Sequence, residues 1–415
     1  MSKQPAPSVI ESKHRGFFYG YVIVASALLI DLILAGIHFT FGVFFKPVSA
    51  EFGWTSAATS GAFTLYSIFH GALFIVTGKI NDRFGPRILL TVSGLFLGLG
   101  YCLMSRISSI WQLYLFYGVL VSIGMSGGFV PILSTVAKWF VKRRGLMTGL
   151  VLAGGGIGQS VLPALTTRLI TAFDWRTAYI IIGGSVFILI ALLAQLLRRD
   201  PNQMGLVAYG SEESCGKNVV SEHSGLSLRQ AMSTRQFWLY CLAIIFAQFG
   251  IGIMVVHSVP YAIGLGMSPT SAAGIVTTFA GVGITARIIS GAVIDRIGGK
   301  RVLVVTSLVI SVALLGLAGT GSILGLYLLS AVFGFGFGGF VSVMSPLAAQ
   351  LFGLTSHGAI FGVASFCATV GGGIGPLVAG AIFDTTNSYS LAFLAGGVLA
   401  FCGLITTLFL KPQSK

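Results

Sequence analysis

The sequence predicts an all-α membrane protein with twelve transmembrane helices in two six-helix, pseudo-symmetric halves. Of its 415 residues, 55% are hydrophobic and only 9% are charged, with a mean hydropathy of +0.92, whereas a soluble domain has about 25% charged residues. Apolar segments of bilayer length recur along the chain, and parts of its first half return in its second half. So few charges cannot cover the surface of a water-soluble fold, which argues against a soluble enzyme.

Twelve apolar segments are long enough to cross a bilayer, because a helix needs about 20 residues to span the hydrocarbon core. We place them at 17–45, 56–77, 88–105, 110–137, 145–171, 177–197, 236–263, 270–291, 302–319, 322–351, 357–383 and 389–410. The first segment is too long for the apolar part of a signal peptide, so we expect it to be retained as a span.

A polar stretch at 198–235 separates the sixth apolar segment from the seventh. Its content of Gly, Ser and charged residues is typical of a linker, with one short amphipathic turn expected near 227–233. We therefore expect an N-terminal six-helix half at 1–197, a cytoplasmic linker at 198–235 and a C-terminal six-helix half at 236–415.

The Lys and Arg residues indicate the orientation of the chain. Of these 25 residues, 20 fall on one side of the predicted spans, four fall on the other side, and Arg287 lies inside a span. The positive-inside rule then places both termini and the linker in the cytoplasm. The net charge of +14 is spread over small clusters, so we expect a lipid bilayer as the surrounding partner and no nucleic acid.

An internal repeat supports the two-half architecture. The segment GKINDRFG at 78–85 returns 213 positions later as GAVIDRIG at 291–298. Gly145 and Gly149 correspond to Gly358 and Gly362 at the same offset. Agreement at one offset indicates duplication of a six-span unit. Two similar helical halves with a site between them are typical of secondary transporters.

The repeated G-x-x-x-D-R-x-G resembles the cytoplasmic loop signature of the major facilitator superfamily, which implies the major facilitator fold. Other motifs resemble the bacterial monocarboxylate and oxalate/formate transporters of that superfamily. They are FGVFFKP at 41–47, EFGW at 51–54, WFVKRRG at 139–145, DWR at 174–176, RQFW at 235–238 and VPYA at 259–262.

This resemblance implies a multi-pass protein of the bacterial cytoplasmic (inner) membrane that transports a small organic monocarboxylate such as lactate or pyruvate. The transport would be proton-coupled symport by alternating access; the alternative is exchange of organic anions of the oxalate/formate type. We expect a functional monomer without enzymatic activity, cofactor or metal site.

The loop signature supplies candidate gating residues in each half. They are Gly78, Asp82, Arg83, Gly291, Asp295 and Arg296. Each aspartate can pair with a nearby Arg or with a helix N-terminus across the interface between the halves. Breaking this contact would accompany opening to one side. A loop that is simply anchored by its charges is the other interpretation.

Arg287 is the leading candidate for binding substrate. It lies eight residues before Asp295, about 12 Å from the cytoplasmic end of its span at about 1.5 Å per residue. A charge at this depth is costly, and the planar guanidinium fits a carboxylate. In the resembled transporters an arginine on this span anchors the anion, and Arg287 matches that position. A structural pair with Asp31 is the alternative.

Asp31 is the only acidic residue within a predicted span, and His38 follows seven residues later on nearly the same helix face. Either could accept a proton, and His38 could also bind the carboxylate. Pairing with Arg287 would instead keep Asp31 ionised, and His38 could serve packing alone. The animal monocarboxylate transporters carry an Asp at the position of Gly283, so their proton coupling cannot be transferred to this chain.

The single basic residue inside a predicted span favours a monocarboxylate. One positive charge neutralises one carboxylate, so the second carboxylate of a dicarboxylate would stay uncompensated. Apolar and aromatic residues of the spans could form the wall of the substrate site. The candidates are Leu28, Tyr114, Tyr117, Phe333, Phe337, Phe361 and Phe366.

Overall fold

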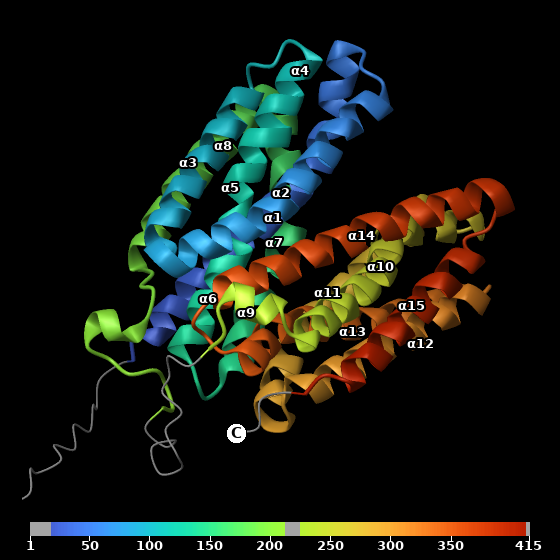
Figure 1. Ribbon diagram of the computed structural model, residues 1–415. Helices are drawn as coiled ribbons and strands as arrows, with labels where there is room; N and C mark the ends of the chain where they lie inside the picture. Colours follow the sequence, from blue (N-terminus) through green and yellow to red (C-terminus); the bar gives the residue numbers. More distant parts are fainter. Residues whose placement is uncertain (1–17, 212–224, 412–415) are drawn as a thin grey trace, which may run out of the picture.

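The structure, a computed structural model, describes residues 18–211 and 225–411 (Figure 1). Within these residues, twelve helical segments are long and apolar enough to cross a membrane, which confirms the predicted fold class. The N-terminal half contains α1 (Gly20–Phe52), α2 (Ser56–Phe84), α3 (Pro86–Met104), a composite fourth span, α7 (Arg144–Ala172) and α8 (Trp175–Leu196). The C-terminal half contains α10 (Arg235–Gly264), α11 (Pro269–Ile297), α12 (Gly299–Gly319), α13 (Ile323–Phe352), α14 (His357–Thr386) and α15 (Ser390–Leu408).

The fourth span is not one regular helix. It consists of α4 (Ile110–Leu113), the π-helix η1 (Tyr114–Val121), α5 (Ser122–Ser126) and α6 (Phe129–Trp139). Hydrophobicity predicted a single segment at 110–137, because apolar composition does not report the hydrogen-bond pattern of a helix. A π-helical stretch is rare and often accompanies a functional site.

The loop signature is mostly helical, whereas the resemblance implied a cytoplasmic loop. Asp82 lies near the end of α2 and Asp295 near the end of α11. Only the final glycines leave the helix, Gly85 with φ of 82° and Gly298 with φ of 87°. Glycine adopts this left-handed region without a steric penalty, so each helix continues until its glycine.

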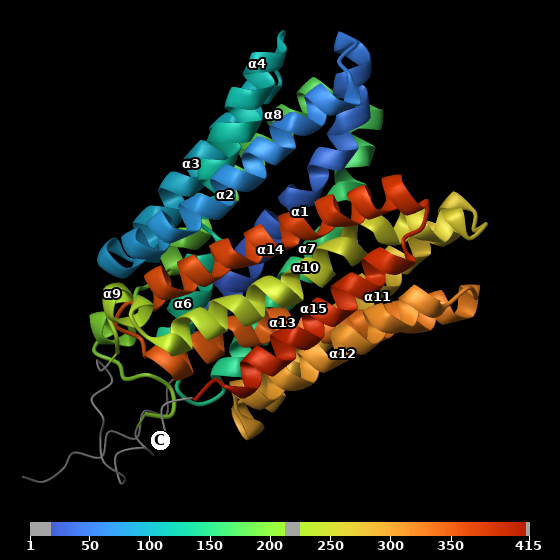
Figure 2. The same ribbon diagram turned by 45° about the vertical axis from the view of Figure 1, so that its right-hand side comes forward.

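Corresponding helices pack alike in the two halves. In the N-terminal half, α1 packs on α7 and α3 packs on α8. In the C-terminal half, the corresponding pairs are α10 with α14 and α12 with α15. Between the halves, α7 packs on α11 and α2 packs on α14. Both ribbon views show the halves meeting near α6 and α9 (Leu228–Met232) and spreading apart away from this end (Figures 1 and 2). We call it the linker end.

The described parts of the linker attach to both halves. After the 3-10 turn η2 (Pro201–Met204), the Tyr209 N–H donates to the carbonyl of Trp139 at 3.0 Å. Beyond the undescribed residues, the Leu226 N–H donates to the carbonyl of Phe352 at 2.9 Å. Trp139 and Phe352 correspond at the repeat offset of 213. The predicted turn near 227–233 is the helix α9.

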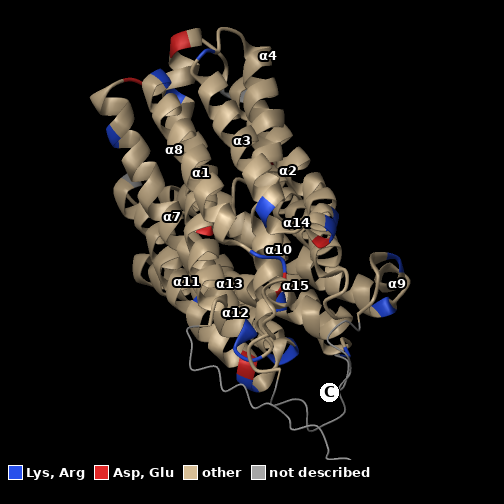
Figure 3. Ribbon diagram, turned by 90° about the vertical axis from the view of Figure 1, so that its left-hand side faces the viewer, with Lys and Arg blue, Asp and Glu red and all other residues tan. Residues whose placement is uncertain are grey.

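Charged residues are separated by long uncharged stretches of helix (Figure 3). The basic residues before the first span, Lys3, Lys13 and Arg15, lie outside the described residues, as does Lys217 of the linker. An acidic cap begins α8: Oδ1 of Asp174 accepts from the N–H of Thr177 at 2.7 Å. The backbone and side-chain hydrogen bonds of Thr177 hold the pKa of this exposed carboxyl below its ordinary value.

Candidate functional site

Arg287 is a buried cation at the contact between the two halves. It is 5% exposed, and its Nη1 donates to the carbonyl of Leu152 on α7 at 2.7 Å. Its Nε is buried and has no hydrogen-bond partner among the described residues. Leaving a buried donor without a partner costs about 1–3 kcal/mol. Nε of Arg287 is therefore an unsatisfied buried donor at the contact between the halves.

Asp31 of α1 is the second buried charge, at 7% exposure. Its Oδ2 lies against Gly155 of α7, where an added Cβ would collide with it. Gly156 packs in the same way against Nη1 of Arg287, which would lie 2.7 Å from an added Cβ. The charges of Asp31 and Arg287 interact, but no ion pair in the described part of the chain joins them.

Aromatic residues of α13 lie beside the cation. The guanidinium carbon of Arg287 is 5.9 Å from the ring centroid of Phe337. Phe337 stacks on Phe333 at 6.1 Å, and Phe333 in turn meets the edge of Phe279 at 5.7 Å. The structure thus brings two of the predicted wall residues, Phe333 and Phe337, to the neighbourhood of Arg287.

His38 belongs to an aromatic cluster in the N-terminal half. Its Nδ1 is 2.9 Å from the hydroxyl of Tyr66 on α2. The Tyr66 ring packs on Tyr117 at 5.1 Å and stacks on His70 at 5.3 Å. Tyr117 is 1% exposed and lies in the π-helix η1. His38 and Tyr117 are therefore joined through Tyr66, a residue that the sequence did not single out.

The other predicted wall residues are more dispersed. Leu28 of α1 packs against Gly154, next to the glycines that contact Asp31 and Arg287. Tyr114 donates its hydroxyl to the carbonyl of Ala58, near the start of α2 and thus far along that helix from its linker end. Phe361 is fully buried and Phe366 is half-buried on α14.

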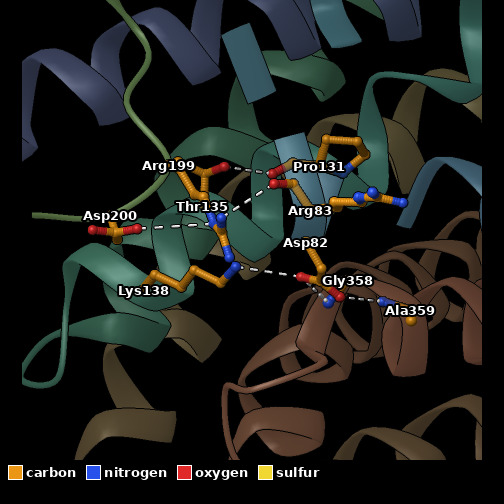
Figure 4. A network of polar contacts seen from close by, with 9 residues as sticks. All are labelled: Asp82, Arg83, Pro131, Thr135, Lys138, Arg199, Asp200, Gly358 and Ala359. Carbon is orange, nitrogen blue, oxygen red and sulfur yellow. Dashed lines mark hydrogen bonds and ion pairs between the residues drawn. The ribbon is translucent and has the colours of Figure 1, made fainter. Parts of the chain in front are cut away.

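At the linker end, Asp82 caps a helix of the other half (Figure 4). Its carboxylate accepts from the backbone N–H groups of Gly358 and Ala359, at 3.1 and 2.9 Å, in the first turn of α14. Lys138 of α6 completes the arrangement with Nζ at 3.3 Å from Oδ1. The positive end of the α14 dipole and Lys138 both favour the carboxylate.

Asp295 makes the reciprocal contact. Its carboxylate accepts from the N–H groups of Gly145 and Leu146, at 2.7 and 2.9 Å, in the first turn of α7. Of the two predicted partners for these aspartates, the structure selects the helix N-terminus across the interface. We refer to the contacts of Asp82 and Asp295 as the two latches.

Glycines let the backbones of the two halves approach at the latches. A Cβ added to Gly78 would collide with the carbonyl of Gly358, and one added to Gly291 would collide with the carbonyl of Gly145. Arg83 and Arg296 are exposed, and neither bonds to a latch carboxylate. Gly78, Gly291 and the aspartates are thus the signature residues at the interface.

His357 is a buried polar residue that the sequence reasoning missed. It is 0% exposed at the start of α14, and its Nε2 is 3.1 Å from the carbonyl of Ser345. Its position immediately before Gly358 was the available signal, because Gly358 was already identified from the repeat. Lys138 of the Asp82 contact entered the sequence analysis only as one of the 20 basic residues on the side predicted to be cytoplasmic.

Three comparisons with known proteins agree with this architecture. The family model described as Major Facilitator Superfamily matches residues 27–372 and 260–415. Monocarboxylate transporter 13 of Bos taurus is 27% identical over 406 residues, covering 96% of this chain and 92% of that protein. The oxalate:formate antiporter of Oxalobacter formigenes is 26% identical over 400 residues, covering 93% and 90%.

Among solved structures, the Escherichia coli fucose:proton symporter superimposes with a TM-score of 0.72. The match covers 94% of this chain and 100% of the symporter at 17% sequence identity, so it concerns the fold. The curated relatives carry the names of the two transporter types that the motifs resemble. Because the family model matches most of the sequence, the chain belongs to the Major Facilitator Superfamily.

Proposed function

We propose that this protein is a secondary active transporter of a small monocarboxylate such as lactate or pyruvate, coupled to a proton and working by alternating access. The observation that carries the proposal is Arg287, a buried guanidinium with one nitrogen free of any partner among the described residues. A carboxylate that accepts from this nitrogen would form a charge-assisted hydrogen bond and relieve the unmet donor.

Charge balance supports a role for a proton. With Asp31 ionised, the two buried charges cancel, and an entering carboxylate would add one uncompensated negative charge. Moving such a charge through the bilayer region is costly. If Asp31 takes up a proton as the anion binds to Arg287, the loaded site is again neutral. His38, bonded to Tyr66, is the second proton acceptor that we consider.

The remaining site residues would shape the path for the anion. We assign Phe333 and Phe337 to an apolar wall beside Arg287. His38 and Tyr117 would form a wall on the N-terminal half. Further wall residues in the proposal are Leu28, Tyr114, Phe361 and Phe366. An apolar enclosure suits the short hydrocarbon part of a monocarboxylate and penalises a second charge.

The latches would hold the linker end closed while the anion enters from the opposite end. In this proposal the units that rock are the halves 1–197 and 236–415, connected by the linker 198–235. Reopening at the linker end requires breaking the contacts of Asp82 and Asp295. We further propose that the linker end faces the cytoplasm of a bacterium, across its inner membrane, and that the monomer is the working unit.

The alternative is exchange of two organic anions, which the similarity to an oxalate:formate antiporter favours. Uptake of labelled lactate into proteoliposomes separates the two mechanisms. Symport predicts uptake that is driven by an imposed pH gradient, inside alkaline, without internal anion. Exchange predicts uptake only into vesicles preloaded with anion. Undiminished uptake by Arg287→Ala would contradict the anchor role in either mechanism.

A further inference from the structure

Helix α7 lies between the two helices that carry the buried charges. Facing α11, Gly145 and Gly149 contact backbone atoms, while the Leu152 carbonyl and Gly156 contact the guanidinium of Arg287. Facing α1, Gly154 and Gly158 contact the backbone of Leu28 and Leu32, and Gly155 contacts the Asp31 carboxylate. Consecutive helical residues are turned by about 100°. Gly155 and Gly156 are thus consecutive residues on different contact faces, Gly155 on the face toward α1 and Gly156 on the face toward α11.

The contact of Gly155 with Asp31 and the contact of Gly156 with Arg287 both depend on the absence of a side chain on the glycine. At Gly156, an added Cβ would lie 2.7 Å from Nη1 of Arg287 and 2.6 Å from Cγ1 of Ile284. At Gly155, it would collide with Oδ2 of Asp31. Oδ2 of Asp31 and Nη1 of Arg287 are the ends of their side chains, and Cγ1 of Ile284 is an apolar side-chain atom, whereas at Gly158 the collision would involve the backbone of Leu32. Alanine at 155 or 156 should therefore move a charged group while the helix packing survives.

We propose that Gly155 and Gly156 are positioning residues of the transport site, which seat Asp31 and Arg287 beside each other without an ion pair between them. Their lack of side chains lets each charge rest directly on α7, and the Leu152 carbonyl fixes Nη1 of Arg287. Nε of Arg287 consequently remains open to a carboxylate. A side chain at either position would move one charge and disturb this separation. The inference rests on the proposed function, because it assigns the positions of the residues that bind the anion and the proton.

The other glycine triplet of the chain supplies matched controls. At Gly373 of α14 an added Cβ meets no atom within 4 Å, and at Gly372 the nearest is the Gln248 carbonyl oxygen at 3.9 Å. Gly281, on α11 with Arg287, also has open space around an added Cβ. Gly373→Ala and Gly281→Ala therefore add the same methyl group to a spanning helix without touching either charge.

The test measures lactate affinity of the purified full-length protein by ligand-induced thermal stabilisation, together with the KM and maximal rate of lactate uptake. Gly156→Ala should weaken binding and raise KM at least tenfold, while Gly373→Ala and Gly281→Ala stay within about twofold of the unmodified protein. Should Gly156→Ala fold poorly, Gly156→Ala combined with Ile284→Ala removes the apolar collision and keeps the one with Nη1. Its affinity should still fall tenfold, and Ile284→Ala alone is its reference.

Gly155→Ala has a separate signature because it displaces Asp31. Pressing this carboxylate toward Arg287 would block anion binding, so removing its charge should restore binding. Asp31→Asn combined with Gly155→Ala should therefore bind lactate at least fivefold more tightly than Gly155→Ala alone. Lack of rescue would overturn the role of Gly155, since damage to packing alone would persist without the charge.

The outcomes also separate this inference from the proposed function. If Arg287→Ala abolishes lactate binding but Gly156→Ala binds like the unmodified protein, the positioning role is wrong and the anchor role stands. If Arg287→Ala binds lactate normally, the proposed function fails and the positioning role fails with it.

Discussion

The two halves of the protein use the same device at the linker end and different chemistry at the centre. At the linker end, Asp82 of the first half caps α14, and Asp295 of the second half caps α7. The glycine contacts are exchanged in the same way, Gly78 with Gly358 and Gly291 with Gly145. The duplicated unit therefore supplies both sides of the closure.

The centre departs from this symmetry. A Cβ at Gly149 would meet the carbonyl of Arg287, and one at Gly362 would meet the carbonyl of Phe74. Phe74 is thus the counterpart of Arg287, and the same offset of 213 places Ile244 opposite Asp31. Each central charge has an apolar counterpart. The duplication therefore provides a scaffold that both halves share, and the positions at which the halves differ in charge are those of the proposed site.

The largest effect is expected from replacing Arg287. Arg287→Ala should lower lactate affinity more than 100-fold, because charge-assisted hydrogen bonds contribute about 1.5–3 kcal/mol each. Phe74→Leu, which keeps an apolar side chain at the counterpart, should keep the affinity within about threefold. Thermal stabilisation by lactate measures both. Equal losses from the two variants would contradict the assignment of anion binding to one half.

Asp31 provides the second test of central asymmetry. Asp31→Asn should abolish uptake driven by a pH gradient and preserve exchange of lactate between internal and external pools. The neutral amide cannot take up the proton, while Arg287 still binds the anion. His38→Gln should retain gradient-driven uptake if Asp31 is the acceptor. The reverse pattern, with coupling lost in His38→Gln alone, would transfer the role to His38.

The latches test the symmetric part of the comparison. Asp295→Asn should shift the equilibrium toward opening of the linker end about tenfold, equivalent to about 1.4 kcal/mol, through weaker bonds to the α7 N-terminus. Asp82→Asn should act more strongly because Lys138 also loses its carboxylate. Adding Lys138→Met to Asp82→Asn should bring its effect close to that of Asp295→Asn.

Alkylation of a cysteine introduced at Thr148 measures this opening, in a background without the native cysteines. Thr148 lies on α7 and is 0% exposed in the closed arrangement, so a water-soluble maleimide should react faster when the linker end opens. Asp384→Asn, at an exposed position near the opposite end of α14 from the Asp82 latch, is the control. Unchanged reactivity in both latch variants would show that these contacts do not control opening.

Much of the architecture could be predicted because hydrophobicity and repetition act along the whole chain. The twelve spans follow from apolar length, and the correspondence of Gly145 with Gly358 follows from the repeat. The prediction also identified Asp31 and Arg287, since buried charges are rare in spans. These features depend on composition and spacing, which a single sequence displays directly.

The missed features depend on contacts between distant segments. The contact of Gly155 with Asp31 arises only when α1 and α7 lie side by side, so a single sequence does not display it. Tyr66 is relevant because it bonds to His38. His357 is relevant because it is buried next to Gly358 of the Asp82 latch. The π-helix η1 could not be predicted from hydrophobicity either, because apolar residues occur equally in π-helices and α-helices within a span.

The smallest expected effect concerns how the last helix of each half begins. Asp174 caps α8 through Thr177, whereas α15 begins after Tyr389 without a side-chain cap. Asp174→Ala should slightly lower the unfolding temperature at neutral pH, since an N-cap acceptor is lost. Tyr389→Phe, at the counterpart, removes no cap, so no loss by this mechanism is expected there.

The effect of Asp174 should also depend on pH in a definite direction. Its pKa is lowered in the folded protein by the bonds from Thr177, so the ionised carboxylate stabilises the fold above the pKa of the unfolded chain, about 3.9. This stabilisation is lost as the pH falls through the lowered value. Unfolding temperatures of the unmodified protein and Asp174→Ala should therefore differ at pH 7 and converge in acid. A difference that grows with acidity would contradict the capping role, because protonation removes the charge that makes the cap favourable.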